Sequence, residues 1–138
     1  MFSRQEVLPL DWAVRYRFAE FTASPAHRVL LRSGREVPLV PRYLDLLLFL
    51  LERRHEAVHR RDIMDGVWSD VVVSDGALSQ AVRSLRRALG DDSREPRFVR
   101  TVSRHGYQFV FADVAQEADD GPLHTASGPP SAPAANEA

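Results

Sequence analysis

A leucine-rich segment, PRYLDLLLFLL at residues 41–51, most constrains how this chain can fold. Pro41 suits the first position of a helix, where its missing N–H costs no hydrogen bond. Four leucines then recur at the i, i+3, i+4, i+7 spacing of one helix face: Leu44, Leu47, Leu48 and Leu51. The apolar residues between them widen this face, so the segment predicts a helix that other elements must cover on most sides.

The segment before this helix, residues 16–40, has the pattern of short strands. Its aromatic and β-branched residues are interrupted by turn signals at Ser24-Pro25 and Ser33-Gly34. We expect three or four antiparallel strands there.

The segment after it predicts two more helices and a β-hairpin. The second helix covers about residues 60–68, and residues 69–73 connect it to the third. Ser74 is a favourable N-cap for the third helix, and Gly90 suits its C-terminal end. Strands at 97–102 and 107–111 follow, and we expect Gly106 to supply the turn conformation between them.

The third helix has two different faces at 100° per residue. The apolar face consists of Leu78, Val82, Leu85 and Leu89, flanked by Ala81 and Ala88. The opposite face consists of Gly76, Gln80, Arg83, Ser84 and Arg87 and has no acid. Long donor side chains without carboxylates suit a helix that enters the major groove of DNA, where Arg reads guanine and Gln reads adenine. An ordinary solvated face explains this helix alone equally well.

The hairpin strengthens the DNA-binding interpretation. Residues 96–112 contain three Arg and no acid, and Arg104 and His105 lie at the expected tip. A cationic tip suits a narrow minor groove, although an exposed turn is the simpler alternative. Three helices followed by a basic hairpin are the order of a winged helix-turn-helix.

Charge divides the chain in two near Phe111. Residues 1–111 hold all 18 Arg and 14 acidic residues, a net charge of +4, and the chain has no Lys. Residues 112–138 hold five acids, no Arg and no aromatic residue, a net charge of −5. Such a composition buries too little apolar surface to fold. We therefore expect an N-terminal extension at 1–14, one domain at 15–112 and a disordered tail or linker at 113–138.

The segment VWSDVVVSDGALSQAVRSLRRALGDDSREPRFVRTVSRHGYQFV resembles the C-terminal half of the OmpR/PhoB-type winged-helix DNA-binding domain, closest to the ToxR/CadC-like regulators. The strongest matches are Val67-Trp68, Ser74-Asp75, LRRALGDD, Thr101-Val102 and GYQF. With the preceding strands and VPRYLDLLLFLL, the resemblance covers about residues 15–112. It implies an α+β fold: a winged helix-turn-helix with an N-terminal antiparallel sheet, three helices and a C-terminal β-hairpin wing.

The resemblance also implies roles for individual residues. The recognition helix, 74–89, would lie in the major groove and the wing, 97–111, on the minor groove or backbone. The base-reading residues would be Gln80, Arg83 and Arg87. The backbone and wing contacts would be Arg60, Arg61, Trp68, Ser84, Arg100, Thr101, Arg104 and His105. Trp68 is an equally good core residue. The loop that can touch RNA polymerase would be Ser69, Asp70, Val71, Val72 and Val73.

Two residues depart from the family pattern and weaken helix caps. His59 stands where a Ser or Thr often caps the second helix, and Val40 where a Thr often precedes the first. The implied partner is double-stranded DNA, in tandem half-sites bound by a homodimer. About 15 residues before the domain leave no room for a receiver domain, so a sensor or effector region would follow the linker. We expect a cytoplasmic protein, tethered to the inner membrane only by a segment after residue 138.

The sequence contains one misleading motif match and allows one alternative function. The segment HEAVH, residues 55–59, matches the H-E-x-x-H zinc-hydrolase motif, but the family pattern places it across a helix end and a turn. Without cysteine, and with no catalytic triad or phosphate loop visible, we expect no enzyme activity, metal or cofactor. The rival is a protein-interaction module that uses a winged-helix scaffold without binding DNA. The acid-free face of the third helix and the basic wing favour the DNA-binding regulator.

Overall fold

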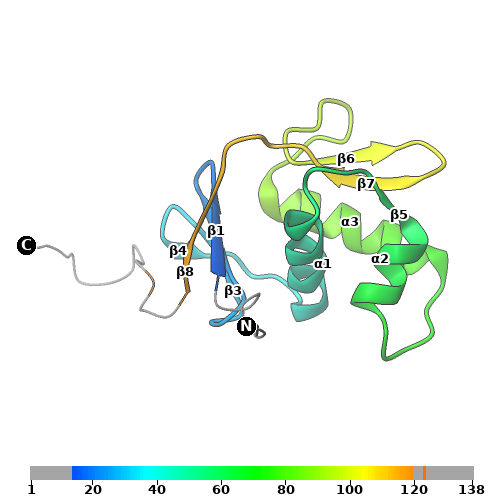
Figure 1. The fold of residues 1–138 in the computed structure, drawn as a ribbon, viewed down its shortest axis with the longest axis horizontal. Helices are drawn as coiled ribbons and strands as arrows, with labels where there is room; N and C mark the ends of the chain where they lie inside the picture. Colours follow the sequence, from blue (N-terminus) through cyan, green and yellow to red (C-terminus); the bar gives the residue numbers. More distant parts are fainter. Residues whose placement is uncertain (1–13, 120–122, 124–138) are drawn as a thin grey trace, which may run out of the picture. The chain divides into compact units, whose positions relative to one another are not determined.

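The computed structural model describes residues 14–119 and residue 123 (Figure 1). The described chain divides into two compact units. One contains the described residues of Met1–Pro38 and Asp113–Ala138, and the other is Leu39–Ala112. The N-terminal strands and the three helices therefore belong to different units.

The first unit is a five-stranded antiparallel sheet in the order β4-β3-β2-β1-β8. Its strands are β1 (Val14–Phe18), β2 (Phe21–Ser24), β3 (Val29–Arg32), β4 (Arg35–Glu36) and β8 (Val114–Ala118). The expected N-terminal strands and the turns at Ser24-Pro25 and Ser33-Gly34 are confirmed. The alternation of side chains along each strand separates an apolar from a polar face.

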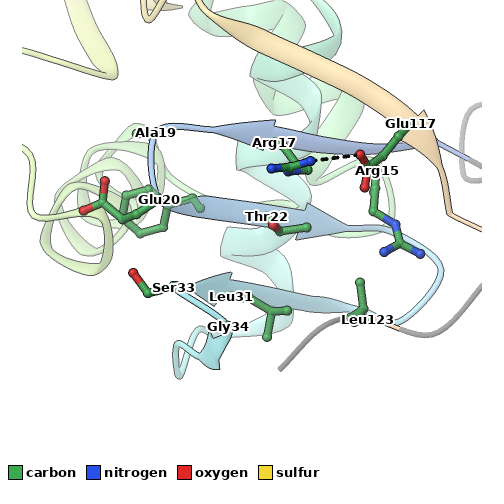
Figure 2. A pocket seen from close by; sticks show the side chains of 11 residues that line it. Arg15, Arg17, Ala19, Glu20, Thr22, Leu31, Ser33, Gly34, Glu117 and Leu123 are labelled. Atoms are coloured by element: carbon green, nitrogen blue, oxygen red, sulfur yellow. Dashed lines mark hydrogen bonds and ion pairs between the residues drawn. The ribbon is translucent and has the colours of Figure 1, made fainter. Parts of the chain in front are cut away.

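The apolar face carries Tyr16, Phe18, Phe21, Ala23 and Leu30, all of them buried. The Phe18 and Phe21 rings stack with their centroids 5.5 Å apart. The opposite face carries Arg17, Thr22 and Leu31 across three adjacent strands (Figure 2). A shallow hollow of about 560 Å³ lies over this polar face.

Strand β8 corrects the expectation of a disordered tail beginning at residue 113. Val114–Ala118 pairs along the full length of β1, as the orange and blue strands of Figure 1 show. The composition argument failed because this short segment needs no core of its own. It completes hydrogen bonds on the edge of a sheet that already exists. Residues 120–122 and 124–138 lie outside the described part of the chain.

A buried carboxylate follows β8 and fastens it to the sheet. The Asp119 side chain is 0% exposed, and its Oδ1 lies 3.0 Å from Nε of Arg15. The Ser24 hydroxyl lies 2.8 Å from both carboxylate oxygens, and the Ala26 N–H donates to Oδ2 at 2.8 Å. Asp119 thus joins the end of β8 to β1 and to the turn after β2.

The second unit contains three helices and a three-stranded sheet. The helices are α1 (Pro41–Glu52), α2 (Arg60–Val67) and α3 (Asp75–Leu89). The sheet has the order β5-β7-β6, from β5 (Val58–His59), β7 (Gly106–Phe109) and β6 (Val99–Val102). The three helices and the hairpin wing are confirmed, and β5 is an addition. No helix in the described residues is long and apolar enough to cross a membrane.

Helix α1 is the centre of this unit, as its leucines predict. Six of its residues are buried: Leu44, Leu46, Leu47, Leu48, Leu50 and Leu51. Both α2 and α3 pack against it. Val40 occupies the N-cap without a side-chain hydrogen bond, so Pro41 at the first position is the main local signal for the start of α1.

Replacing Asp119 by Ala should lower the free energy of unfolding by about 3 kcal/mol, because it removes a buried carboxylate that pairs with Arg15 and accepts hydrogen bonds from Ser24 and Ala26. Urea denaturation measures this loss. Glu117→Ala on the same strand is the matched control. Its ion pair with Arg17 is exposed, so its effect should stay within about 0.5 kcal/mol. Equal effects of the two substitutions would contradict an anchoring role for Asp119.

Candidate nucleic-acid interface

The two faces of α3 lie as the sequence predicts. Leu78, Ala81, Val82, Leu85 and Leu89 are buried. On the opposite face Gln80, Arg83 and Arg87 are exposed and Ser84 is half-buried. Gly90 ends the helix in the left-handed conformation, at φ 68°, while Ser74 occupies the N-cap without a side-chain hydrogen bond. The three long polar side chains are therefore available to a partner on one helical face.

The wing turn is formed differently from the expectation. Arg104 adopts the left-handed conformation, at φ 63°, and Gly106 does not. Gly106 instead pairs with His59 of β5 and begins β7. A Cβ atom there would overlap the Val58 carbonyl oxygen and lie 2.8 Å from the Arg60 nitrogen. Glycine is required because the backbone of β5 passes so closely.

Two histidines connect α2 to the base of the wing. His59 caps α2, since its Nδ1 accepts the Arg61 N–H at 3.0 Å. The imidazole thus replaces the Ser or Thr that the family pattern expects. The Nε2 of His105 lies 3.1 Å from the Ala57 carbonyl oxygen, and its ring meets that of His59 edge-on at 5.1 Å. His105 lies in the turn of the wing, as expected, and its half-buried ring faces β5.

The structure also decides between the two interpretations of Trp68. Trp68 is 7% exposed and lies in the apolar core at the end of α2. The core interpretation is therefore favoured over a contact with the DNA backbone.

Two hollows on the surface share lining residues and join α3 to the wing. The first, of about 200 Å³, is lined by Arg60, Leu78, Ser79, Thr101, Val102, Arg104, His105, Gly106 and Tyr107. The second, of about 570 Å³, is lined by Ser79, Arg83, Arg86, Arg87, Asp91, Asp92, Ser93 and Tyr107. Ser79 and Tyr107 belong to both. The structure thus brings four predicted cations onto one continuous surface: Arg60, Arg83, Arg87 and Arg104.

Sequence reasoning missed Ser79, Arg86 and Tyr107 on this surface. Ser79 lies four residues before Arg83, so helical periodicity could have found it. Tyr107 could not be placed without the register of the wing, in which it faces Thr101.

Arg100 does not join this surface. It faces Gln108 in the register, and its Nη2 donates to the Gln108 amide oxygen at 3.1 Å. Because neighbouring strand residues point to opposite faces, Arg100 points away from the Thr101 side of the wing. It lines another hollow with Arg54 and His55.

The loop between α2 and α3 exposes apolar side chains yet is held in place. Val72 is fully exposed and Val71 is 46% exposed. Arg42 of α1 donates to the Asp70 carboxylate at 2.8 Å and to the Val67 carbonyl oxygen at 2.6 Å. The hydrogen bond from Arg42 lowers the pKa of Asp70, and the same bond raises the pKa of Arg42.

The HEAVH segment runs from the turn after α1 into β5 and forms no helix. Its two histidines therefore lack the shared helical face that the zinc motif requires. Among the described residues no cluster of three His, Asp or Glu side chains is arranged to hold a metal ion.

Comparison with known protein families decides the assignment. The family model "Transcriptional regulatory protein, C terminal" matches residues 34–109, which contain all three helices and the wing. The chain belongs to this family. The OmpR/PhoB-type resemblance of the sequence is thereby confirmed, as is the winged helix-turn-helix fold.

Individual relatives are regulators of transcription. The chain is 30% identical over 120 residues to the transcriptional activator CadC of Escherichia coli, a match over 86% of this chain and 23% of CadC. It is 36% identical over 80 residues to the regulator HilA of Salmonella typhimurium, over 58% of this chain and 14% of HilA. The chain thus spans a quarter or less of the length of these relatives.

Solved structures give the same result. The DNA-binding domain of E. coli CadC has a TM-score of 0.64 and 29% identity, over 73% of this chain and 94% of that one. The Klebsiella pneumoniae RstA DNA-binding domain, solved in complex with the RstA box, has a TM-score of 0.63 and 25% identity. That match covers 71% of this chain and 98% of the RstA domain.

Replacing Gly106 by Ala should lower the free energy of unfolding by about 2 kcal/mol or more, since the added methyl group collides with the backbone of β5. Thermal and urea denaturation measure this. Gly76→Ala on the exposed side of α3 is the control, because its Cβ would meet only the Ser74 hydroxyl at 3.6 Å. That change should stabilise the protein by about 0.5–1 kcal/mol. A neutral Gly106→Ala would contradict the close approach of β5.

Acid should release the loop at residues 69–73. The lowered pKa of Asp70 means that its ion pair stabilises the loop above the ordinary pKa of an aspartate and is lost as pH falls through the lowered value. Backbone ¹⁵N relaxation of the loop, followed against pH, should therefore show mobility only in strongly acidic solution. Asp70→Asn should make the loop mobile at neutral pH. A rigid loop in that variant would show that the ion pair of Asp70 with Arg42 does not hold it.

Proposed function

We propose that this chain binds double-stranded DNA with sequence specificity and thereby regulates transcription. The main support for this proposal is the continuous surface that joins the exposed Arg83 and Arg87 of α3 to Arg60 and Arg104 beside the wing. Membership of the family and the likeness to a domain solved with its DNA box support this proposal. Contact with DNA also implies that this domain works in the cytoplasm.

The exposed face of α3 has the chemistry of a reading head for the major groove. An Arg guanidinium donates two parallel hydrogen bonds to O6 and N7 of guanine, which suits Arg83 and Arg87. Gln80 presents both a donor and an acceptor, as adenine requires. Ser84, half-buried beside them, suits a contact with a phosphate at the groove edge.

The surrounding cations suit the DNA backbone. Arg60 and Arg61 lie in the first turn of α2, where the helix dipole favours a phosphate. Arg104 at the exposed tip of the wing suits the minor groove, and Thr101 lines the same hollow as Arg60 and Arg104. Arg100 points to the other face of the wing, so we place it outside the principal contact set.

The remaining partners follow from the exposed loop and from the family. We propose that residues 69–73, with Val71 and Val72 exposed and Asp70 fixed by Arg42, offer a contact for RNA polymerase. We further propose that two copies bind tandem half-sites on DNA.

Arg83→Ala should weaken binding to the cognate duplex by about 1–3 kcal/mol and relax specificity at one position, because it removes a base contact. Binding to random DNA should change much less. Arg104→Ala should weaken cognate and random DNA by similar factors, because a wing-tip contact reads backbone or groove shape.

Fluorescence anisotropy on cognate and scrambled duplexes at several salt concentrations separates these effects, after selection of the cognate site from a random DNA pool. Arg104→Ala should reduce the log–log salt slope by about one unit. Both side chains are exposed, so both variants should keep the wild-type melting temperature. Equal weakening of both duplexes by Arg83→Ala would show that α3 is not the reading head.

A further inference from the structure

The C-terminal end of α3 grips the first wing strand through a guanidinium. Arg86 lies between the exposed Arg83 and Arg87 in sequence but is half-buried. Its Nε and Nη2 donate to the Val99 carbonyl oxygen at 3.2 and 3.1 Å, and Nη2 donates to the Thr101 hydroxyl at 2.7 Å. The hydrogen-bonding capacity of Arg86 is therefore directed into the protein, toward β6.

A carboxylate grips the same strand from the other side. The Asp91 N–H donates to the Arg86 carbonyl oxygen at 2.8 Å, which fixes Asp91 to the end of the helix. Its Oδ1 accepts the Arg97 N–H at 2.7 Å. Its Oδ2 accepts the N–H groups of Phe98 and Val99 at 3.2 and 2.8 Å. One side chain thus receives three successive backbone donors of the segment that leads into the wing.

The hydrogen bonds from Arg86 and those to Asp91 meet at Val99. Its carbonyl accepts from Arg86 and its N–H donates to Asp91, so the backbone of one residue is held from both directions. Burial of apolar area has no direction and allows one element to slide over another. A guanidinium fork and a two-oxygen carboxylate fix distance and angle together.

We propose that Arg86 and Asp91 are positioning residues that set the place of the wing tip relative to the base-reading face of α3. This inference rests on the proposed function, in which α3 and the wing engage neighbouring grooves of one duplex. The two contacts can form together only if the separation between Arg83 and Arg104 matches the DNA. Arg86 and Asp91 hold that separation before DNA arrives, so binding does not have to order the wing.

The test uses Arg86→Lys, which keeps the positive charge and loses the planar fork. Binding to the selected cognate duplex is compared for wild type, Arg104→Ala, Arg86→Lys and the double variant. In the wild-type background, Arg104→Ala should lower the affinity for the duplex about tenfold. In the Arg86→Lys background, the same change should lower it less than about twofold. Arg83→Ala should cost the same factor in both backgrounds. This selective loss is a readout that a merely structural role would not produce.

Matched changes at Thr101 and Asp91 extend the test. Thr101→Ser keeps the hydroxyl acceptor and should leave the Arg104 contribution unchanged, whereas Thr101→Val should reduce it. Asp91→Asn presents one carbonyl oxygen to the four backbone N–H groups that the carboxylate now accepts, and it should reduce the Arg104 contribution further. The proposal would be overturned if Arg104→Ala lowered the affinity for the duplex by the same factor in the Arg86→Lys protein as in wild type. An equal loss of the Arg83 and Arg104 contributions would also overturn it and would leave Arg86 with a purely structural role.

A measurement on the free protein separates this proposal from the proposed function. Residual dipolar couplings of β6 and β7 amides, referred to those of α3, should fit one fixed orientation in wild type. They should be scaled down in Arg86→Lys and Asp91→Asn. Unchanged couplings would overturn the positioning role. Absence of DNA binding by wild type, with couplings scaled down in the variants, would overturn only the proposed function.

Discussion

The burial of α1 is the constraint on which the arrangement of the second unit depends. Its leucines face several directions, and four of them are 0% exposed: Leu46, Leu47, Leu50 and Leu51. One neighbouring helix cannot cover so wide a face, so both α2 and α3 pack against it. Once the apolar stripe of α3 is committed inward, helical geometry forces its arginine face outward. The proposed reading head is therefore a consequence of the core.

Local patterns predicted what local chemistry determines. The proline at the start of α1, the apolar stripe of α3 and the glycine after α3 each act within a few residues, and the structure has all three where the sequence predicts them. Strand β8 was missed because its stability comes from a partner strand far away in sequence, with Arg17 facing Ala115, 98 residues on. The role of Gly106 was misjudged for the same reason, since only the register with β5 reveals the close approach. Non-local pairing leaves little trace in a single sequence.

The arginines show the same limit for the site. Composition predicted a basic surface, yet arginines of this chain do quite different work. Arg15 is buried against Asp119, Arg42 holds the loop before α3, and Arg86 holds the wing. Helical position separated Arg83 and Arg87 from the core, but it could not show that Arg86 between them turns toward β6. The residues that make an interface rigid carry the same sequence signal as those that make the contact.

The pairing of β8 with β1 also determines how the described domain responds to tension. Val14 faces Ala118 in this ladder, so the start of β1 and the end of β8 lie side by side at the same end of the sheet. A force that separates these two ends breaks the hydrogen-bonded pairs of the ladder one at a time from that end, instead of breaking all pairs at once. The carboxylate of Asp119, which pairs with Arg15 of β1, lies at the end of the ladder where this separation begins. A pull on the two ends of this ladder would therefore load the β1–β8 pairs one after another, from Val14 and Ala118 inward.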